Sequence, residues 1–368
     1  MKSTALVFAL LGASAGSVWA QQSAPTVYGV LDAGMVSERG CTSNCTVRVD
    51  SGMASESRVG IRGMEDVNGK LSVVYGLEAG LQLDTGRSDQ GGRLFGRQAY
   101  VGIKGDAGAV TVGRQQNLEY SALTEVGDPF KGGTAGSATN LIGTAGRRED
   151  NSIHYHTGAL HGVSAAASYS RDESTDQSVG AGTLAMSGNR TWGLSVGLES
   201  GPWVLRAAHQ NRSLGGAAPL TALGANGVEA KNSVIAANMR MGFGTAYAAY
   251  SVSRGYASSP LWNPDNPYSA AISTTPSTDS RDMLIGVAVP VRGATLLASF
   301  IRKNDRDQAN QDANQLALGA TYAMSRRTDF YAAYSRINNR NGAAYTVGNA
   351  SSRGAGTSAI NVGMRHAF

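Results

Sequence analysis

Five charged residues in the first half of the chain have types and spacing that could do chemistry together. Val59 and Ile61 alternate with two arginines, so in a strand those arginines share the face that the apolar pair leaves free. Rings of basic side chains favour anions, and acidic rings favour cations. If these residues surround a narrow channel, they predict that the channel weakly prefers anions. The alternative is that they are ordinary solvated side chains. The five residues are Arg58, Arg62, Glu78, Arg97 and Arg148.

Two acids lie in a long connection between the last two of these arginines. Glu125 and Asp128 occupy the stretch 116–149, which continues into a run rich in Gly, Ser, Thr and Ala. A connection this long is usually functional or disordered. If it folded back toward the arginines, its carboxylates would face them and set a transverse field. We therefore expect both acids to face the opening.

Three histidines raise the possibility of a metal site. His154 and His156 would share a face of a strand, and His161 follows across a tight turn. Imidazole is a common transition-metal ligand. No Asp, Glu or Cys joins the histidines at a recognisable ligand spacing, so we predict no metal and no cofactor.

Two cysteines, Cys41 and Cys45, are separated by three residues. In an oxidising compartment we expect one local disulfide in a loop. A metal or redox pair at this spacing would need further ligands or a strand–helix context.

Sequence motifs of catalysis are missing. No nucleophile elbow, HExxH, P-loop or dinucleotide-binding fingerprint occurs in a fitting context. Scattered Ser, His and Asp residues could still meet in space, so a barrel enzyme of the protease or lipase type stays open as an alternative.

Strict alternation dominates the segments that must position the charged residues. In the segments 71–82, 191–199 and 315–324, large apolar residues occupy every second position and small or polar residues the positions between. Each is about 9–13 residues long, the length of a tilted strand that crosses a membrane. The segment 93–115 alternates poorly, which would fit a wall that packs against another subunit.

The connections alternate strictly between short and long, and together they give the number of strands. Seven short turns and eight long loops make fifteen connections, hence sixteen strands with all short turns at one end. The short turns are 66–69, 105–108, 158–160, 200–202, 241–244, 291–293 and 325–328, and the long loops are 38–53, 85–92, 116–149, 173–187, 213–227, 255–278, 303–311 and 340–356.

A sixteen-stranded sheet of this kind is expected to close. In lipid every backbone polar group must be paired internally, which only helices and closed barrels achieve. Past residue 20 no apolar run approaches the ~18 residues of a transmembrane helix. We therefore predict an all-β fold, a sixteen-stranded antiparallel transmembrane barrel. At this strand number a barrel encloses an aqueous channel, and the long third loop 116–149 is expected to fold into it.

The two ends of the chain agree with this fold. Residues 1–20 combine Lys2, a short apolar core and small residues before position 21, so we predict a cleaved signal peptide and a mature barrel domain at 21–368. The alternative for residues 1–20 is a buried helix or a membrane helix at the N-terminus. The last strand alternates from Ile360 to Phe368; its apolar face should point outward and pair with the first strand near 27–35, with Arg365 facing water.

Composition excludes a nucleic-acid binder. The chain carries 16% charged residues and 48 glycines, and its net charge of +5 comes from scattered residues rather than a basic run. Soluble domains usually carry about 25% charge. Basic runs or aromatic-plus-basic modules mark nucleic-acid binding, and neither occurs.

Seven stretches, in order along the mature chain, resemble the trimeric general-diffusion porins of Gram-negative outer membranes, in the β-proteobacterial branch. They are TVYGVLD at 26–32, SRVGIRGMED at 57–66, GLE at 76–78, FGRQAYVG at 95–102, VGRQ at 112–115, DNSIHY at 150–155 and GMRHAF at 363–368. The third loop, with GDPF at 127–130, and the cysteine pair depart from the family pattern.

The resemblance implies a homotrimer and a water-filled outer-membrane channel for passive diffusion of ions and small hydrophilic solutes, and no enzyme. Arg58, Arg97 and Arg148 match the basic cluster that faces the third loop in anion-selective members. Phe368 matches the residue that the family presents to the barrel-assembly machinery. Outer-membrane lipid and lipopolysaccharide are the other expected partners. A barrel enzyme and a surface adhesin are the alternatives.

Overall fold

The computed structural model describes residues 25–42, 45, 47–144, 146–171, 175–179, 182–186, 190–215, 227–255, 258–260, 277–352 and 354–368. The expected signal peptide at 1–20 lies outside these residues.

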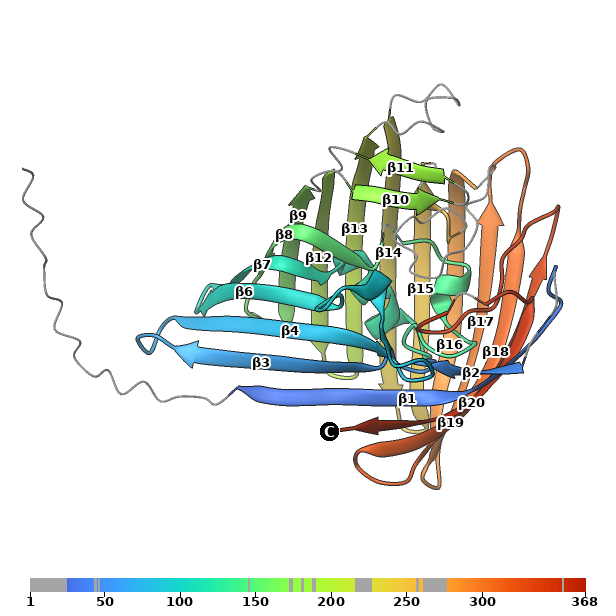
Figure 1. The fold of residues 1–368 in the computed structure, drawn as a ribbon, viewed down its shortest axis with the longest axis horizontal. Coiled ribbons are helices and arrows are strands. Elements are labelled where there is room, and N and C mark those ends of the chain that lie inside the picture. The colour runs from blue at the N-terminus through green and yellow to red at the C-terminus, as the bar shows by residue number, and fades with distance from the viewer. Residues whose placement is uncertain are drawn as a thin grey trace, which may run out of the picture.

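Sixteen long strands form one closed antiparallel ring (Figure 1). Each strand pairs with the next long strand along the chain, and the ring closes where β20 pairs with β1. The predicted number and order of strands are confirmed. The strands are β1 (Thr26–Arg39), β3 (Arg58–Asp66), β4 (Ser72–Gln82), β6 (Gln98–Gly105), β7 (Gly108–Gln116), β8 (Arg148–His156), β9 (Val163–Arg171), β12 (Arg190–Ser200), β13 (Trp203–Gly215), β14 (Gly227–Met241), β15 (Gly244–Arg254), β16 (Asp279–Val291), β17 (Ala294–Asp305), β18 (Ala313–Ala323), β19 (Thr328–Asn339) and β20 (Ser358–Ala367).

Smaller elements lie in the connections. Two connections that were expected to be loops without strands contain short strands. β2 (Val47–Ser51) pairs with the second half of β1 inside the expected loop 38–53. The pair β10 (Thr175–Val179) and β11 (Gly182–Met186) forms a separate hairpin inside the expected loop 173–187. The others are β5 (Arg87–Ser88), η1 (Gln90–Gly92), α1 (Leu118–Ser121), η2 (Ala122–Gly127) and η3 (Ala138–Asn140).

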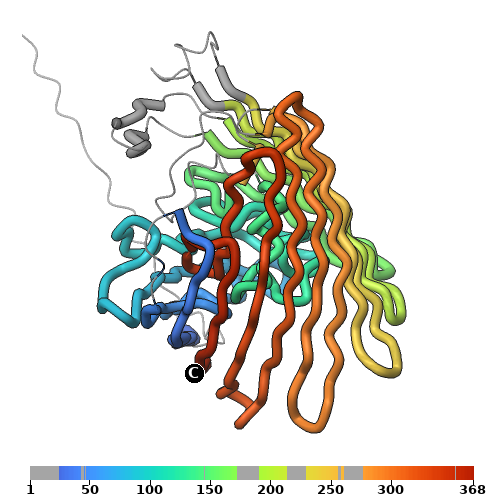
Figure 2. The backbone as a smooth tube through the Cα atoms, turned by 90° about the vertical axis from the view of Figure 1, so that its right-hand side faces the viewer, coloured from blue at the N-terminus to red at the C-terminus, as the bar shows by residue number. Residues whose placement is uncertain are grey.

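All seven tight turns lie at one end of the ring, opposite the long loops. The turns between β16 and β17 and between β18 and β19 are seen at the bottom of Figure 2. Several of the turns need glycine; Gly201 has φ 55° and Gly293 has φ 88°, in the left-handed region that side chains disfavour. The predicted turns at 200–202 and 291–293 are therefore explained by backbone geometry.

The two faces of the wall differ as the alternation predicts. Along β12 every second residue is exposed and those between are buried. Leu194 and Val196 are 52% and 55% exposed on the outer face, although both are apolar. An exposed apolar band around a closed sheet is the surface that lipid covers.

The closing strand pairs with the first strand, as predicted. Ten residue pairs join β1 to β20, from Val30 opposite Ala367 to Arg39 opposite Ser358. Beyond them, Gly29 and Phe368 exchange two backbone hydrogen bonds of 3.1 Å. Arg365 faces inward and pairs with Asp329 at 2.9 Å. The last edge of the sheet is thereby paired.

None of the helices in the described part of the chain is long and apolar enough to span a membrane.

Candidate functional site

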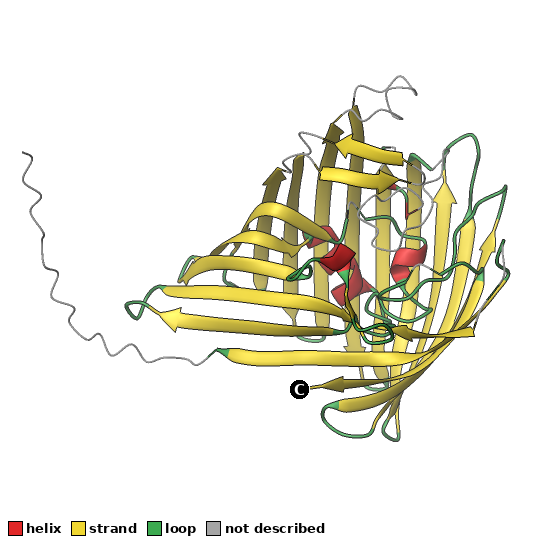
Figure 3. Ribbon diagram, in the orientation of Figure 1, coloured by secondary structure: helices red, strands yellow, loops and turns green. Residues whose placement is uncertain are grey.

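The connection between β7 and β8 packs against the inner faces of the opposite wall (Figure 3). It begins where the side chain of Asn117 accepts hydrogen bonds from the backbone N–H groups of Glu119 and Tyr120, capping α1. Further along, the Asn238 side chain of β14 donates to the carbonyl oxygen of Val126 at 3.1 Å. We call residues 117–144 the inner segment.

Two inward glycines let the inner segment approach the wall closely. A Cβ atom at Gly286 of β16 would lie 2.7 Å from Pro129, and one at Gly319 of β18 would lie 2.7 Å from Phe130. Phe130 is only 6% exposed and belongs to the buried apolar cluster with Leu123. The inner segment is thus docked by packing and does not hang free.

Asp128 organises the turn that presents Phe130. Its carboxylate is fully buried and accepts hydrogen bonds of 2.9 Å from the backbone N–H groups of Phe130, Gly132 and Ala138. This corrects the expectation that Asp128 faces the opening, because a buried carboxylate bound to three N–H groups holds the backbone instead. Lys131, at the tip of the turn, is exposed.

Burial raises the pKa of the Asp128 carboxyl from 3.8 to about 6, because loss of hydration outweighs the three N–H groups. The docked segment therefore binds a proton more readily than the free segment. Docking should be strongest below pH 4 and should weaken by roughly 3 kcal/mol as the pH rises through 6. Hydrogen exchange of the 128–138 amides, corrected for intrinsic rates, measures this effect. Wild type should show less protection at pH 7.5 than at pH 5, and Asp128→Asn should show no such change. Equal protection of wild type at both pH values would contradict the prediction.

On the wall that carries β3, β4 and β6, three of the predicted arginines join one ion-pair network. Arg58 lies 3.4 Å and Arg97 2.6 Å from the carboxylate of Glu78. Tyr28 also donates its hydroxyl proton to Glu78, at 2.9 Å. Arg148 lies close by, because its side chain donates to the backbone carbonyl oxygen of Arg97 at 3.0 Å.

Glu56 is the hub of this network, and sequence reasoning missed it. Its carboxylate contacts Arg97, lies 2.6 Å from Arg148 and lies 3.1 Å from Arg147. Four arginines thus share two glutamates in the described ion pairs. The signal in the sequence was weak, since Glu56 precedes β3 and so lies outside any alternating segment.

The short connection that carries Glu56 is fastened to β1 by Asp32. The buried Asp32 carboxylate accepts the backbone N–H groups of Ala54 and Ser55 at 3.0 and 2.8 Å, and also the Tyr331 hydroxyl. This fixes where Glu56 enters the lumen.

Asp32→Ala should destabilise the barrel by about 3 kcal/mol, because it leaves one buried and two half-buried donors without their acceptor. The midpoint of urea unfolding, followed by heat-modifiable gel mobility, measures this effect. Asp329→Ala is the matched control: its partner Arg365 is one-third exposed, so the loss should stay below about 1 kcal/mol. Equal losses in the two variants would refute the role given to Asp32.

Two predicted residues lie outside the network. Arg62 is exposed, and its guanidinium stacks over the Tyr28 ring at 4.9 Å. Glu125 of the inner segment is also exposed and pairs with Arg206 of β13 at 3.0 Å. A further ion-pair group was not foreseen: Asp150 binds Arg93 at 2.6 Å and also Arg114.

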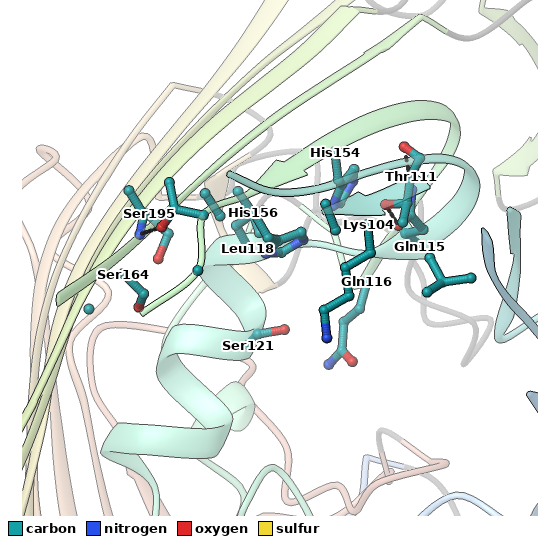
Figure 4. Close-up of a pocket in the computed structure, with 18 of the residues that line it drawn as sticks. Lys104, Thr111, Gln115, Gln116, Leu118, Ser121, His154, His156, Ser164 and Ser195 are labelled. Carbon is teal, nitrogen blue, oxygen red and sulfur yellow. Dashed lines mark hydrogen bonds between the residues drawn. The ribbon is translucent and has the colours of Figure 1, made fainter. Parts of the chain in front are cut away.

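A cavity of about 670 Å³ separates the inner segment from the neighbouring wall (Figure 4). Lys104, His156 and Arg206 line it from the strands, and Ser121 and Glu125 line it from the inner segment. Its lining is mixed, with three basic residues and one acid among these. The space therefore has charged and polar side chains among an otherwise mixed lining.

The histidines do not form a metal site. The rings of His154 and His156 are 5.9 Å apart, and His154 lies 3.3 Å from Glu149. His161 has φ 51° in the turn that follows β8. Over the residues that the structure describes, no group of three His, Cys, Asp or Glu side chains could hold a metal ion.

Cys41 and Cys45 form the predicted disulfide, with Cα atoms 5.5 Å apart. It closes a short loop after β1 and constrains that loop.

Comparisons with known proteins agree on one family. The family model described as "Gram-negative porin" matches residues 3–342. The chain is 27% identical to an outer membrane porin protein of Bordetella pertussis over 412 aligned residues. It is 26% identical to outer membrane porin protein 32 of Delftia acidovorans over 384 aligned residues. Both alignments cover the whole of this chain and the whole of the relative. Among solved structures, an anion-selective porin from Comamonas acidovorans superposes with a TM-score of 0.75 at 22% identity, covering 94% of this chain and 100% of that one.

Proposed function

Because this chain belongs to the Gram-negative porin family, we propose that its arginine-rich lumen gives a passive-diffusion channel a weak preference for small anions. The protein is a porin of the bacterial outer membrane, and its closed barrel is the wall of a water-filled channel. The anion preference is the part that we add.

The excess of arginine over glutamate in the ion-pair network is the observation that carries this proposal. In the described ion pairs, Glu56 and Glu78 are the two carboxylates that the four guanidinium groups of Arg58, Arg97, Arg147 and Arg148 share, so arginine outnumbers glutamate in this network. Their positive charge is held on a rigid wall, opposite the inner segment. Fixed positive charge at a constriction attracts anions and repels cations. The shared glutamates keep the preference weak.

The reversal potential of wild-type channels under a tenfold KCl gradient tests the proposal. Anion preference requires a reversal potential displaced toward the chloride equilibrium potential. A value at zero or displaced toward the potassium side would reject it. High ionic strength should reduce the displacement, because salt screens charges over about 10 Å at 0.1 M.

We further propose that the channel assembles as a homotrimer through the wall that includes β6 and β7. Outer-membrane lipid, lipopolysaccharide and, through Phe368, the barrel-assembly machinery are its other proposed partners. Residues 1–20 are proposed as the cleaved signal peptide and 21–368 as the mature chain. Chemical crosslinking of membranes tests the trimer: a ladder ending at three copies is expected, and a single monomer band would refute it.

No observation in the described residues favours the barrel enzyme or the adhesin over the channel. The relatives reported above are named as porins, which are channels. A barrel enzyme would turn over a substrate at its rim, whereas diffusion through this channel requires no turnover.

A further inference from the structure

The last long connection, between β19 and β20, also folds into the lumen, where its trace is dark red in Figure 1. Tyr345 of this connection is 1% exposed and belongs to the same buried apolar cluster as Ile301 of β17 and Ile337 of β19. Both isoleucines occupy buried, inward positions between exposed neighbours of their strands. The lumen therefore holds a second folded segment besides the inner segment. We call residues 343–352 the strap.

One end of the strap covers an ion pair in the barrel wall. Lys303 of β17 lies 2.9 Å from Asp282 of β16, and both side chains are fully buried. The Tyr345 ring faces the Lys303 ammonium, with 5.7 Å between the ring centroid and the nitrogen. Taking two charges out of water has a large free-energy cost. Undocking of the strap would return water to this pair, so this end is held less tightly than its apolar contacts alone would hold it.

The other end of the strap reaches two segments that are distant in the sequence. The backbone N–H of Gly348 donates to the side-chain oxygen of Asn140, in the inner segment, at 3.0 Å. The backbone N–H of Ala350 donates to the carbonyl oxygen of Met53, between β2 and β3, also at 3.0 Å. The strap and the inner segment therefore lie side by side in the lumen, and both reduce its open cross-section.

Arg147 fastens the strap to the ion-pair network. Its buried guanidinium group donates to the carbonyl oxygen of Ala350 at 2.7 Å and lies 3.1 Å from the carboxylate of Glu56. The same group stacks over the ring of Tyr120, in the inner segment, at 5.4 Å. A guanidinium group has several donors in a fixed plane and can stack on aromatic rings, which suits it to join three partners. Arg147 is thus placed to position the strap.

We propose that the strap is a second size-selecting element of the channel, and that Arg147 is the residue that positions it. With the strap docked, the strap and the inner segment together set the largest neutral solute that passes. This inference rests on the proposed channel function but not on the proposed anion preference. Neutral sugars carry no net charge, so their passage reports the open cross-section and not the field of the arginines.

Swelling of proteoliposomes in arabinose and in raffinose tests the proposal with the purified, full-length protein. In Tyr345→Ala the rate for raffinose relative to arabinose should rise about threefold or more, because truncating a buried aromatic side chain removes packing that holds the strap. Tyr334→Ala is the matched control. It removes the same atoms from the outward face of β19, where Tyr334 is 42% exposed, and its ratio should equal that of wild type.

Variants of Arg147 separate its positioning role from its charge. Arg147→Gln should raise the raffinose ratio as well, and Arg147→Lys should lie closer to wild type, because an ammonium group can still donate to the Ala350 carbonyl oxygen. The double variant Tyr345→Ala, Arg147→Gln should rise no further than the larger single effect, since both changes release the same strap. A shifted reversal potential with an unchanged raffinose ratio in Arg147→Gln would reduce Arg147 to a lumen charge and overturn its positioning role.

Hydrogen exchange of wild type tests the docking without any variant. The amides of Gly348 and Ala350 should be protected, because each donates to another segment in the lumen. Exchange of both at intrinsic rates would overturn the proposal, as would an unchanged raffinose ratio in Tyr345→Ala or an equal rise in Tyr334→Ala. A wild type closed even to arabinose would contradict the channel function itself, so the two failures are distinguishable.

Discussion

Arg148→Glu should move the ion preference of the channel toward cations. The substitution changes the network charge by two units and places a second carboxylate beside Glu56, which now lies 2.6 Å from Arg148. Two unit charges about 7 Å apart in water interact by ~0.6 kcal/mol, close to the thermal energy. The ratio of anion to cation permeability should therefore fall by about threefold or more. The reversal potential under a KCl gradient measures it.

Two companion variants make the result specific. Arg148→Gln removes one charge without adding another, so its shift should be about half as large. Arg336→Glu reverses a charge on the outer face of β19 and should leave the reversal potential unchanged. A shift in Arg336→Glu as large as that in Arg148→Glu would mean that net charge, and not the lumen network, sets the preference.

Phe130→Ala should loosen the packing of the inner segment against the wall. Phe130 is 6% exposed, and its ring fills the space above Gly136 and Gly319. Truncating a buried phenylalanine typically costs about 3–5 kcal/mol. Leu123, Leu141 and Ile142 of the inner segment are buried in the same cluster, so its docking should weaken without being lost. Single-channel records should show a larger mean conductance and more open-channel noise than wild type.

Phe300→Ala is the matched control, because the same atoms are removed from the outer, lipid-facing side of β17. Phe300 is 37% exposed there and contacts no part of the inner segment. Its conductance should equal that of wild type. Unchanged conductance in Phe130→Ala would show that the inner segment does not limit ion flow.

The barrel was predictable from the sequence because the bilayer imposes a rule on every strand. One face must be apolar and every backbone group must be paired, so the alternation in the segment 191–199 and the turn at 200–202 suffice to place β12 and β13. Arg58 and Glu78 could be placed for the same reason, since an alternating strand allows only two directions for a side chain. Arg97 precedes β6 in a segment that alternates poorly, so only the family resemblance indicated its role.

Prediction failed where no periodicity exists. Asp128 lies in an irregular segment, and only the folded backbone reveals that three N–H groups converge on its carboxylate. Glu56 lies in the connection between β2 and β3, where residue type alone gives no direction. β2 itself is short and pairs with β1 across a disulfide-closed loop, which hid it inside an expected long connection.

Single-channel conductance of the purified wild-type protein in planar bilayers tests the account most directly. An open barrel narrowed by the docked inner segment predicts discrete steps, a linear current–voltage relation at low voltage, and a step size that grows with salt concentration. No catalytic substrate should be needed. Absence of conductance steps from folded protein would contradict the claim that the lumen is a continuous water-filled channel.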